Sequence, residues 1–345
     1  MSIYFFTDPH LGVTRHSHTT VPSRQRLKDA VFDVVGQVLA QAGQAPVICL
    51  GDLFDTTTND EATIYQGMVT AKRCAAILAG NHDLPNREGK LSSLQLLSTF
   101  NDQVIRGHLD SPGFQFQLLE GTGVYFVPHM ATQELFDQSL SEVTAYARAN
   151  PQPQTLLCLH CNYNSGLIHN DASLNLTRER AEQLLESFTY VLLGHEHIPR
   201  TDFGGRLLIL GNTHPTSFSD ISDKWLWKLE GGQFEQIPLW SQADGYRAIA
   251  FDALADTAIA AGVQFVDVTG SATLEQMPDI AQQVAHLWRD HPGLLMVRNA
   301  VECATSLAAI EVETHKHLDL PSRISTALEG NDLLPLWTHY LGAAQ

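Results

Sequence analysis

The sequence is short of cysteine and has no long apolar run, and each shortage excludes a class of protein. Five cysteines in 345 residues are too few, and odd in number, for the disulfide framework of a small secreted protein. No apolar run reaches the ~18 residues that a membrane-spanning helix needs, and the start of the chain lacks the basic segment of a signal peptide. We therefore expect a cytoplasmic protein without a membrane segment.

Basic residues are also scarce, since 21 Lys and Arg face 38 Asp and Glu and give a net charge of −17. A non-specific nucleic-acid coat needs Lys and Arg to neutralise phosphates, so the charge argues against one. It leaves a nuclease open, because bound metal ions can make such a site locally positive. One acid-free segment runs from Arg15 to Lys28 and includes Arg24 and Arg26. This segment fits either phosphate contacts or a solvated helix start.

Apolar material is ample, because 44% of the residues are hydrophobic, and this excludes a disordered or fibrous chain. Short apolar runs alternate with helical patterns, which predicts a layered α/β fold. Strands are expected at residues 3–7, 47–50, 75–79, 124–127, 155–160, 190–193 and 207–210. Helices are expected at residues 23–42, 60–73, 91–100, 133–148 and 177–187, and hairpins at 113–128 and 224–239.

The pattern changes near residues 241–245. Strands at 246–251, 263–268 and 294–298 and an amphipathic helix at 273–289 predict a small αβ unit. We therefore divide the chain into a domain over 1–240, a small αβ domain over 245–300 and a tail over 301–345. The tail has several apolar residues between 320 and 341, which fit either a helix that docks a partner or a segment folded onto its own core.

Histidines, carboxylates and one amide stand at the ends of five predicted strands. They are Asp8, His10, Asp52, Asn81, His160, His195 and His197. The carboxyl ends of strands in an open α/β sheet converge on one crevice, so these side chains are expected to meet there. The glycines that precede Asp52, Asn81 and His195 would let the backbone turn tightly toward that site.

The chemistry of these seven side chains predicts two metal ions. They offer nitrogen and oxygen but no thiolate, and they exceed the ligands of one tetrahedral zinc. Two divalent ions sharing one carboxylate would promote an in-line displacement at phosphorus. His129 also ends a strand, but chain order and the distance to His195 favour His160. Cys158 and Cys161 flank His160, yet no second cysteine pair supports a redox or zinc site.

The five motifs, taken in this order, resemble the calcineurin-like metallophosphoesterase superfamily. The segments 8–12, 51–55 and 211–218 are similar to those of SbcD-type DNA repair exonucleases and of phage recombination nucleases. The resemblance covers residues 1–225 by motif and 246–298 by layout only. It implies a four-layer αββα sandwich with a small C-terminal αβ capping domain. It also implies a location in the bacterial cytoplasm, or in that of the host if the chain is phage-encoded.

The resemblance implies a role for each site residue. Asp8, His10 and His197 would bind one ion, and Asn81, His160 and His195 the other, with Asp52 bridging. His82 would act beside the leaving oxygen, with Asp55 orienting its imidazole. Manganese is the expected metal, with magnesium, iron and zinc as alternatives. The sequence departs from the usual pattern at residues 212–215, which leaves the role of His214 open.

The implied function is that of a metal-dependent DNA exonuclease and single-strand endonuclease in a repair or recombination complex. DNA, an SbcC-type coiled-coil ATPase and a second copy of the chain are the implied partners. Candidate phosphate contacts are Arg15, Arg24, Arg26, Arg87 and Lys90, which flank the motif loops. A phosphodiesterase or phosphatase for small substrates is the alternative that the acidic charge favours. A metal-free scaffold is disfavoured, because every ligand position is filled.

Overall fold

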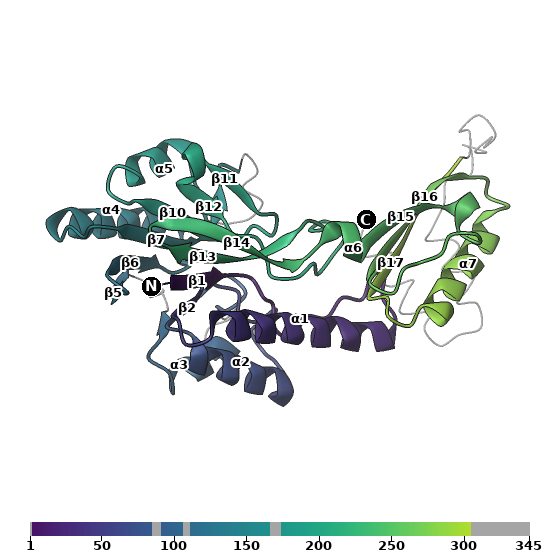
Figure 1. Cartoon of the computed structure of the whole chain (residues 1–345), viewed down its shortest axis with the longest axis horizontal. Coiled ribbons are helices and arrows are strands. Elements are labelled where there is room, and N and C mark those ends of the chain that lie inside the picture. Colours follow the sequence, from purple (N-terminus) through teal and green to yellow (C-terminus); the bar gives the residue numbers. More distant parts are fainter. Residues whose placement is uncertain (1, 85–90, 106–110, 166–173, 305–345) are drawn as a thin grey trace, which may run out of the picture.

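Two stacked six-stranded sheets form the main body of the protein (Figure 1). The structure is a computed structural model, and it describes residues 2–84, 91–105, 111–165 and 174–304. The first sheet has the order β14-β13-β1-β2-β3-β4. Its strands are β1 (Ser2–Phe6), β2 (Val47–Cys49), β3 (Ala76–Leu78), β4 (Val104–Ile105), β13 (Lys224–Glu230) and β14 (Gln233–Trp240). Strands β1 to β4 run parallel, and β13 is antiparallel to β1.

The second sheet has the order β11-β12-β10-β7-β6-β5. Its strands are β5 (Gln115–Leu119), β6 (Thr122–Val127), β7 (Thr155–His160), β10 (Tyr190–Gly194), β11 (Arg200–Asp202) and β12 (Leu207–Ile209). Strands β6, β7, β10 and β12 are parallel, and the β7–β10 register sets His160 beside Gly194. The ends of these two strands therefore deliver His160 and His195 to the same place.

Burial on both faces explains the near-continuous apolar strands. In β1, Ile3 and Phe5 pack between the two sheets, while Phe6 packs under the helices on the other face. The helices on the first sheet are α1 (Val21–Ala42), α2 (Glu61–Arg73) and α3 (Ser93–Ser98). Those on the second are α4 (Gln133–Ala149) and α5 (Arg178–Leu184). The layers run helix, sheet, sheet, helix, and the predicted αββα fold is confirmed.

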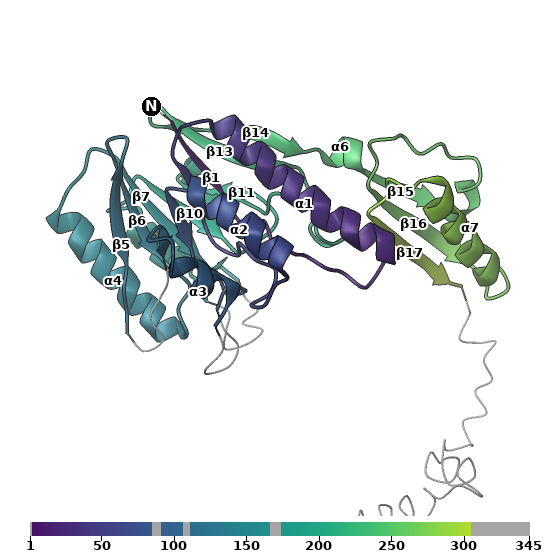
Figure 2. The ribbon, with the colours of Figure 1, turned by 90° about the horizontal axis from the view of Figure 1, so that it is seen from below.

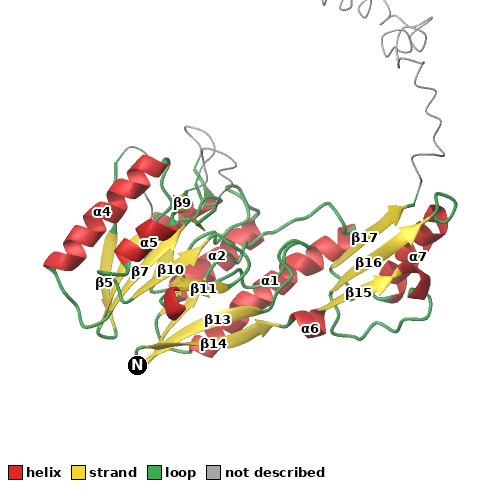
Figure 3. Cartoon of the chain, turned by 90° about the horizontal axis from the view of Figure 1, so that it is seen from above, coloured by secondary structure: helices red, strands yellow, loops and turns green. Residues whose placement is uncertain are grey.

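Residues 246–303, here called the C-terminal module, form a three-stranded parallel sheet. Its strands are β15 (Tyr246–Ala250), β16 (Phe265–Ala272) and β17 (Met296–Cys303), and its helix is α7 (Met277–Asp290). The helix packs on one face of the sheet (Figure 3). Phe265 and Met296 belong instead to the core beneath α1, and Figure 2 shows α1 reaching from the main body to the module. The module is thus fixed to the main body.

Every predicted strand and helix is present, with bounds shifted by a few residues. The short elements were missed: β4, β8 (Asn162–Tyr163), β9 (Asn175–Leu176), β11, α6 (Gln242–Gly245) and the 3₁₀ turns at Phe203–Gly205 and Phe251–Ala253. Strand β17 continues to Cys303, past the boundary predicted at residue 300. From residue 305 on, the predicted tail lies outside the described residues. None of the helices described is both long and apolar enough to cross a membrane.

Candidate metal centre

All seven predicted ligands lie together where strands of the two sheets end. Asp8 and His10 follow β1, Asp52 follows β2 and Asn81 follows β3. The other three come from the second sheet: His160 is the last residue of β7, and His195 and His197 follow β10.

Asp8, His10 and His197, here called the first group, converge through their side-chain tips. The Nε2 atoms of His10 and His197 are 3.0 Å apart, and Asp8 Oδ1 lies 3.9 Å from each of them. Asp8 Oδ1 is buried and has no hydrogen-bond partner among the described residues. A buried carboxylate oxygen without a donor is costly, and a divalent cation between these three atoms would satisfy it. The first group therefore fits a metal ion.

Asn81, His160 and His195, here called the second group, share one oxygen. Asn81 Oδ1 is 3.1 Å from His160 Nε2 and 2.8 Å from His195 Nδ1. His160 Nδ1 donates to the carbonyl of Leu50 at 2.8 Å, so its Nε2 is the nitrogen left to bind a metal. Imidazole and amide ligands of this kind suit manganese, iron or zinc.

Asp52 lies between the two groups. Its Oδ1 is 3.4 Å from His160 Nε2 and accepts a hydrogen bond of 2.9 Å from the backbone N–H of His82. Its carboxylate is also clustered with His10 of the first group. This is the position that a bridging ligand needs, although the bridging role itself stays a prediction.

The backbone around the site is strained, as is common at functional sites. Asp8, His10, Asp52 and His195 have φ values of 49°, 51°, 48° and 92°, in a region that non-glycine residues seldom adopt. Glycines precede Asp52 and His195 and leave room for the surrounding groups. A Cβ on Gly51 would lie 2.2 Å from His160 Nδ1, and one on Gly194 would lie 2.4 Å from Thr7 Oγ1.

The electrostatics of the site favour a bound cation. Burial lowers the pKa of both His10 and His195 to about 4, so these imidazoles are neutral and able to bind metal near pH 7. Burial alone would raise the pKa of Asp52, but the facing imidazoles of His160 and His10 outweigh it and hold this pKa well below its usual range. Burial alone would lower the pKa of His160, but the carboxylates of Asp52 and Asp8 outweigh it and raise this pKa to about 9. The carboxylates of Asp52 and Asp8 thus favour positive charge at this place, which a divalent ion would supply.

Asp55 contacts the His82 imidazole through its backbone and not, as a carboxylate partner would, through its side chain. His82 Nδ1 lies 2.6 Å from the backbone carbonyl oxygen of Asp55. The Asp55 carboxylate accepts two hydrogen bonds from Arg15, at 2.9 and 3.0 Å, and its Oδ1 lies 3.4 Å from His10 Nδ1. A cation from another loop competes better for the carboxylate than an exposed imidazole does. Asp55 thus faces the first group rather than His82.

The candidate phosphate contacts lie in different places in the structure. Arg15 is close to the site, with 30% of its side chain exposed. Arg26 donates to the carbonyl of Leu294 at 3.0 Å and so binds the C-terminal module, while Arg24 donates to Thr19. Arg87 and Lys90 lie outside the described residues.

Three charged residues beside the centre were not found from the sequence. The Asp83 carboxylate accepts hydrogen bonds from the backbone N–H groups of Leu53, Phe54 and Gly80. Asp220 Oδ2 lies 3.2 Å from His197 Nδ1. Lys224 Nζ donates to the carbonyl of His197 at 2.9 Å and to that of Asp220 at 2.6 Å. No sequence pattern marks these three residues, because each stands in or next to a polar loop without periodicity.

Two histidines with open roles lie outside the metal groups. His129 is buried, and its Nδ1 lies 3.5 Å from the backbone carbonyl oxygen of His160 rather than beside another predicted ligand. His214 is buried against Trp240 and Phe265, with ring centroids 6.2 and 6.0 Å apart. Cys158 and Cys161 are buried, and burial raises the pKa of both thiols, which does not suit redox chemistry.

A groove of about 520 Å³ opens beside His195 and His197. Its other walls come from residues 162–165 and from Glu196, Ile198, Arg200, Ser219 and Asp220. Arg200 lines it and pairs with Glu196 at 2.7 Å, and Ile198 is 49% exposed. The groove thus adjoins one predicted ligand of each metal group.

The sequence model described as calcineurin-like phosphoesterase matches residues 1–199. A DNA double-strand break repair protein Mre11 from Sulfolobus acidocaldarius is 24% identical over 234 residues, which are 65% of this chain. The match spans 57% of the length of that protein. Two of the similar solved structures are the calcineurin-like phosphoesterase YfkN from Bacillus subtilis and the NAD nucleotidase NadN from Haemophilus influenzae.

Both structural likenesses are distant. For YfkN the identity is 10% and the TM-score 0.37, over 69% of this chain and 88% of the other. For NadN the identity is 11% and the TM-score 0.38, over 69% of this chain and 49% of the other.

Proposed function

The chain belongs to the calcineurin-like phosphoesterase family and is a metal-dependent hydrolase of ester bonds, and we propose that it acts on DNA as a nuclease. The observation that carries the proposal is the similarity to Mre11 over 65% of the chain. The match to Mre11 therefore extends over more of the chain than the match to the family as a whole, which covers residues 1–199. The groove beside His195 and His197 supports the same proposal, because a polymer needs an open path past the site.

The six residues of the two groups, together with Asp52, would hold two divalent ions, for which manganese is our proposal. When bound, the ions neutralise charge on the phosphate and lower the pKa of water. Arg15 would contact a phosphate and thereby position the strand without reading its sequence.

His82 would donate a proton to the leaving oxygen. Its side chain is exposed, and its ring lies 5.0 Å from that of His10, measured between centroids. The hydrogen bond from Nδ1 to the Asp55 carbonyl fixes the ring, so Nε2 on the opposite side of the ring is the atom free to face the substrate.

Digestion of end-labelled linear and circular DNA tests this function. With Mn²⁺ we expect both exonuclease and single-strand endonuclease products, with less product in Mg²⁺, because imidazole ligands bind magnesium poorly. EDTA should stop the reaction. Bis-p-nitrophenyl phosphate is the comparison substrate, and hydrolysis of this small ester alone would indicate a small-substrate phosphodiesterase instead.

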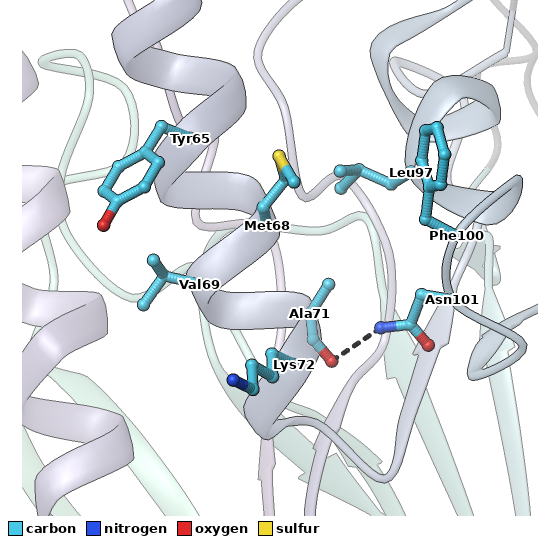
Figure 4. Close-up of a pocket in the computed structure, with 8 residues that line it drawn as sticks. All are labelled: Tyr65, Met68, Val69, Ala71, Lys72, Leu97, Phe100 and Asn101. Atoms are coloured by element: carbon cyan, nitrogen blue, oxygen red, sulfur yellow. Dashed lines mark hydrogen bonds between the residues drawn. The ribbon is translucent and has the colours of Figure 1, made fainter.

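A second copy of the chain is a proposed partner, and the apolar face of α2 and α3 is its proposed contact. Tyr65, Met68 and Val69 on α2 are 64%, 49% and 40% exposed, and Phe100 after α3 is 80% exposed. Figure 4 shows these side chains around a pocket of about 420 Å³. An exposed apolar face of this kind is typical of an interaction surface.

Charge self-complementarity favours a second copy as the occupant. Glu61, Tyr65, Met68 and Lys72 recur along one stripe of α2. If two such helices pair about a two-fold axis, Glu61 of each copy meets Lys72 of the other. Sedimentation should show that Glu61→Lys weakens the dimer and that adding Lys72→Glu restores it. A wild-type monomer at all concentrations would overturn this contact.

An SbcC-type coiled-coil ATPase is the other proposed partner, and this proposal rests on the resemblance. The segment to which we assign docking, residues 320–345, lies outside the described residues. Deleting it should abolish pull-down of the ATPase and leave Mn²⁺-dependent hydrolysis intact. Unchanged pull-down would refute the assignment.

A further inference from the structure

The loop over residues 211–223 holds both the backbone and the imidazole of His197. The backbone N–H of Asn212 donates to the carbonyl of His197 at 3.3 Å, and Lys224 at the end of the loop donates to the same carbonyl. Asp220 accepts from the ring at Nδ1. Asp220 and Lys224 are 2% and 0% exposed, so both side chains that hold His197 are buried.

The surroundings of Asp220 require a carboxylate. Oδ2 accepts from His197 Nδ1, from Asn212 Nδ2 at 2.8 Å, and from the N–H and hydroxyl of Thr216, each at 3.1 Å. Oδ1 accepts from the N–H and hydroxyl of Ser217 at 2.8 and 3.0 Å. An ionised carboxylate accepts at both oxygens without carrying a proton, whereas a protonated one would point an O–H donor at these donors. An amide in either orientation would turn its NH₂ group toward donors.

The hydrogen bond to Asp220 determines which nitrogen of His197 faces the first group. With its proton on Nδ1, the ring presents a lone pair at Nε2. That Nε2 is the atom 3.0 Å from His10 Nε2 and 3.9 Å from Asp8 Oδ1. Asp220 thereby orients His197 toward the place where an ion would bind.

The same loop contacts the C-terminal module on its other side. The ring centroids of Phe218 and Phe265 are 6.1 Å apart. The guanidinium of Arg298 lies 4.7 Å from the centroid of the Phe218 ring. Arg298 is in turn fixed by two hydrogen bonds to Asp267. Only Ser219 separates Phe218 from Asp220 along the loop, so a change at the module contact reaches the carboxylate through a short stretch of backbone.

We infer that Asp220 is a positioning residue for His197 and that the C-terminal module, through Phe218, is part of that positioning. The module then has a role in the metal centre, because it stabilises the position of His197. The inference rests on the proposed role of His197 as a metal ligand, so His197→Ala is the reference variant in its test.

The test is Mn²⁺ binding to the purified, chelator-treated full chain, followed by electron paramagnetic resonance. Wild type should bind two ions, and His197→Ala should lose the one at the first group. Asp220→Asn should weaken that same site by about 10- to 100-fold and leave the other unchanged. Asp60→Asn is the matched control: Asp60 also accepts from Lys28 and from a backbone N–H, and its variant should keep both affinities.

The module contact is tested in the same assay. Phe218→Ala should weaken the first group's ion by less than Asp220→Asn does, and Phe218→Leu, which keeps an apolar contact with Phe265, should recover most of the loss. Phe203→Ala is the control, because Arg178 stacks on that ring at 4.6 Å elsewhere in the main body; its affinities should stay unchanged. These variants carry the test by themselves if Asp220→Asn does not fold.

The outcomes separate the inference from its premise. If His197→Ala keeps two ions, the ligand role of His197 is wrong. If His197→Ala loses one ion while Asp220→Asn and Phe218→Ala keep wild-type affinity, the positioning is wrong. Equal weakening of both ions would indicate general destabilisation and would also overturn it.

Discussion

His160 of the second group is the last residue of β7 and is buried between the sheets, whereas His197 of the first group lies in a loop beyond β10. His160 is held by a backbone carbonyl and by close packing against Gly51, Gly80 and Gly194. His197 is held by Asp220 and Lys224, two charged side chains from another loop. His160 is therefore positioned by its strand and by packing, whereas His197 is positioned by side chains that single substitutions can remove.

Asp52 belongs to neither group, and its substitution should have the largest effect. Asp52→Asn removes the carboxylate that both ions would share, so we expect each Mn²⁺ affinity to fall by more than the ~100-fold typical of an outer residue. Turnover should fall further than in any variant of a single terminal ligand. Metal analysis beside a DNA digestion measures both quantities. Retention of two ions with near-normal turnover would show that Asp52 does not bridge.

His82 should separate chemistry from metal binding. General-acid assistance is typically worth ~10²–10⁴-fold, so His82→Ala should lose that much turnover on DNA while both ions stay bound. The loss should be much smaller on p-nitrophenyl esters, whose leaving group is stable without a proton. Loss of an ion would instead make His82 a ligand, and normal DNA cleavage would assign the acid elsewhere.

Asp55 should affect the first group alone. Its carboxylate lies 3.4 Å from His10 Nδ1 and binds Arg15, so Asp55→Asn should weaken the first ion by about 10- to 100-fold. The ratio of DNA to p-nitrophenyl ester turnover should stay near that of wild type, in contrast to His82→Ala. A changed ratio would restore the original assignment of Asp55 to His82.

The second group should respond to packing rather than charge. In Gly80→Ala the new Cβ would lie 2.1 Å from Asp52 Oδ1 and 2.7 Å from His160 Nε2, and overpacking of this kind costs about 1–3 kcal/mol. Gly36→Ala in α1 is the control, because nothing lies within 4 Å of its Cβ position. Urea melts should show a loss for Gly80→Ala and none for Gly36→Ala. Equal stability of both variants would contradict the packing argument.

The difference between the two groups also explains what the sequence could predict. The ligands follow apolar strands, and the convergence of strand ends brings them together, so their residue types and order are visible in the sequence. The partners of the first group come from distant loops: Arg15 and Asp55 are 40 positions apart, and His197 and Asp220 are 23 apart. No periodic pattern links such positions, so Asp220 was missed and the contact of the Asp55 carboxylate with Arg15 was not predicted.

The most direct test of the two-metal account is a titration of Mn²⁺ into the chelator-treated chain, with hydrolysis of end-labelled linear DNA followed in the same samples. The account predicts two ions bound per chain and DNA hydrolysis that appears only as the second ion binds. Hydrolysis that persists in excess EDTA, or a chain that cleaves DNA without binding Mn²⁺, would contradict it.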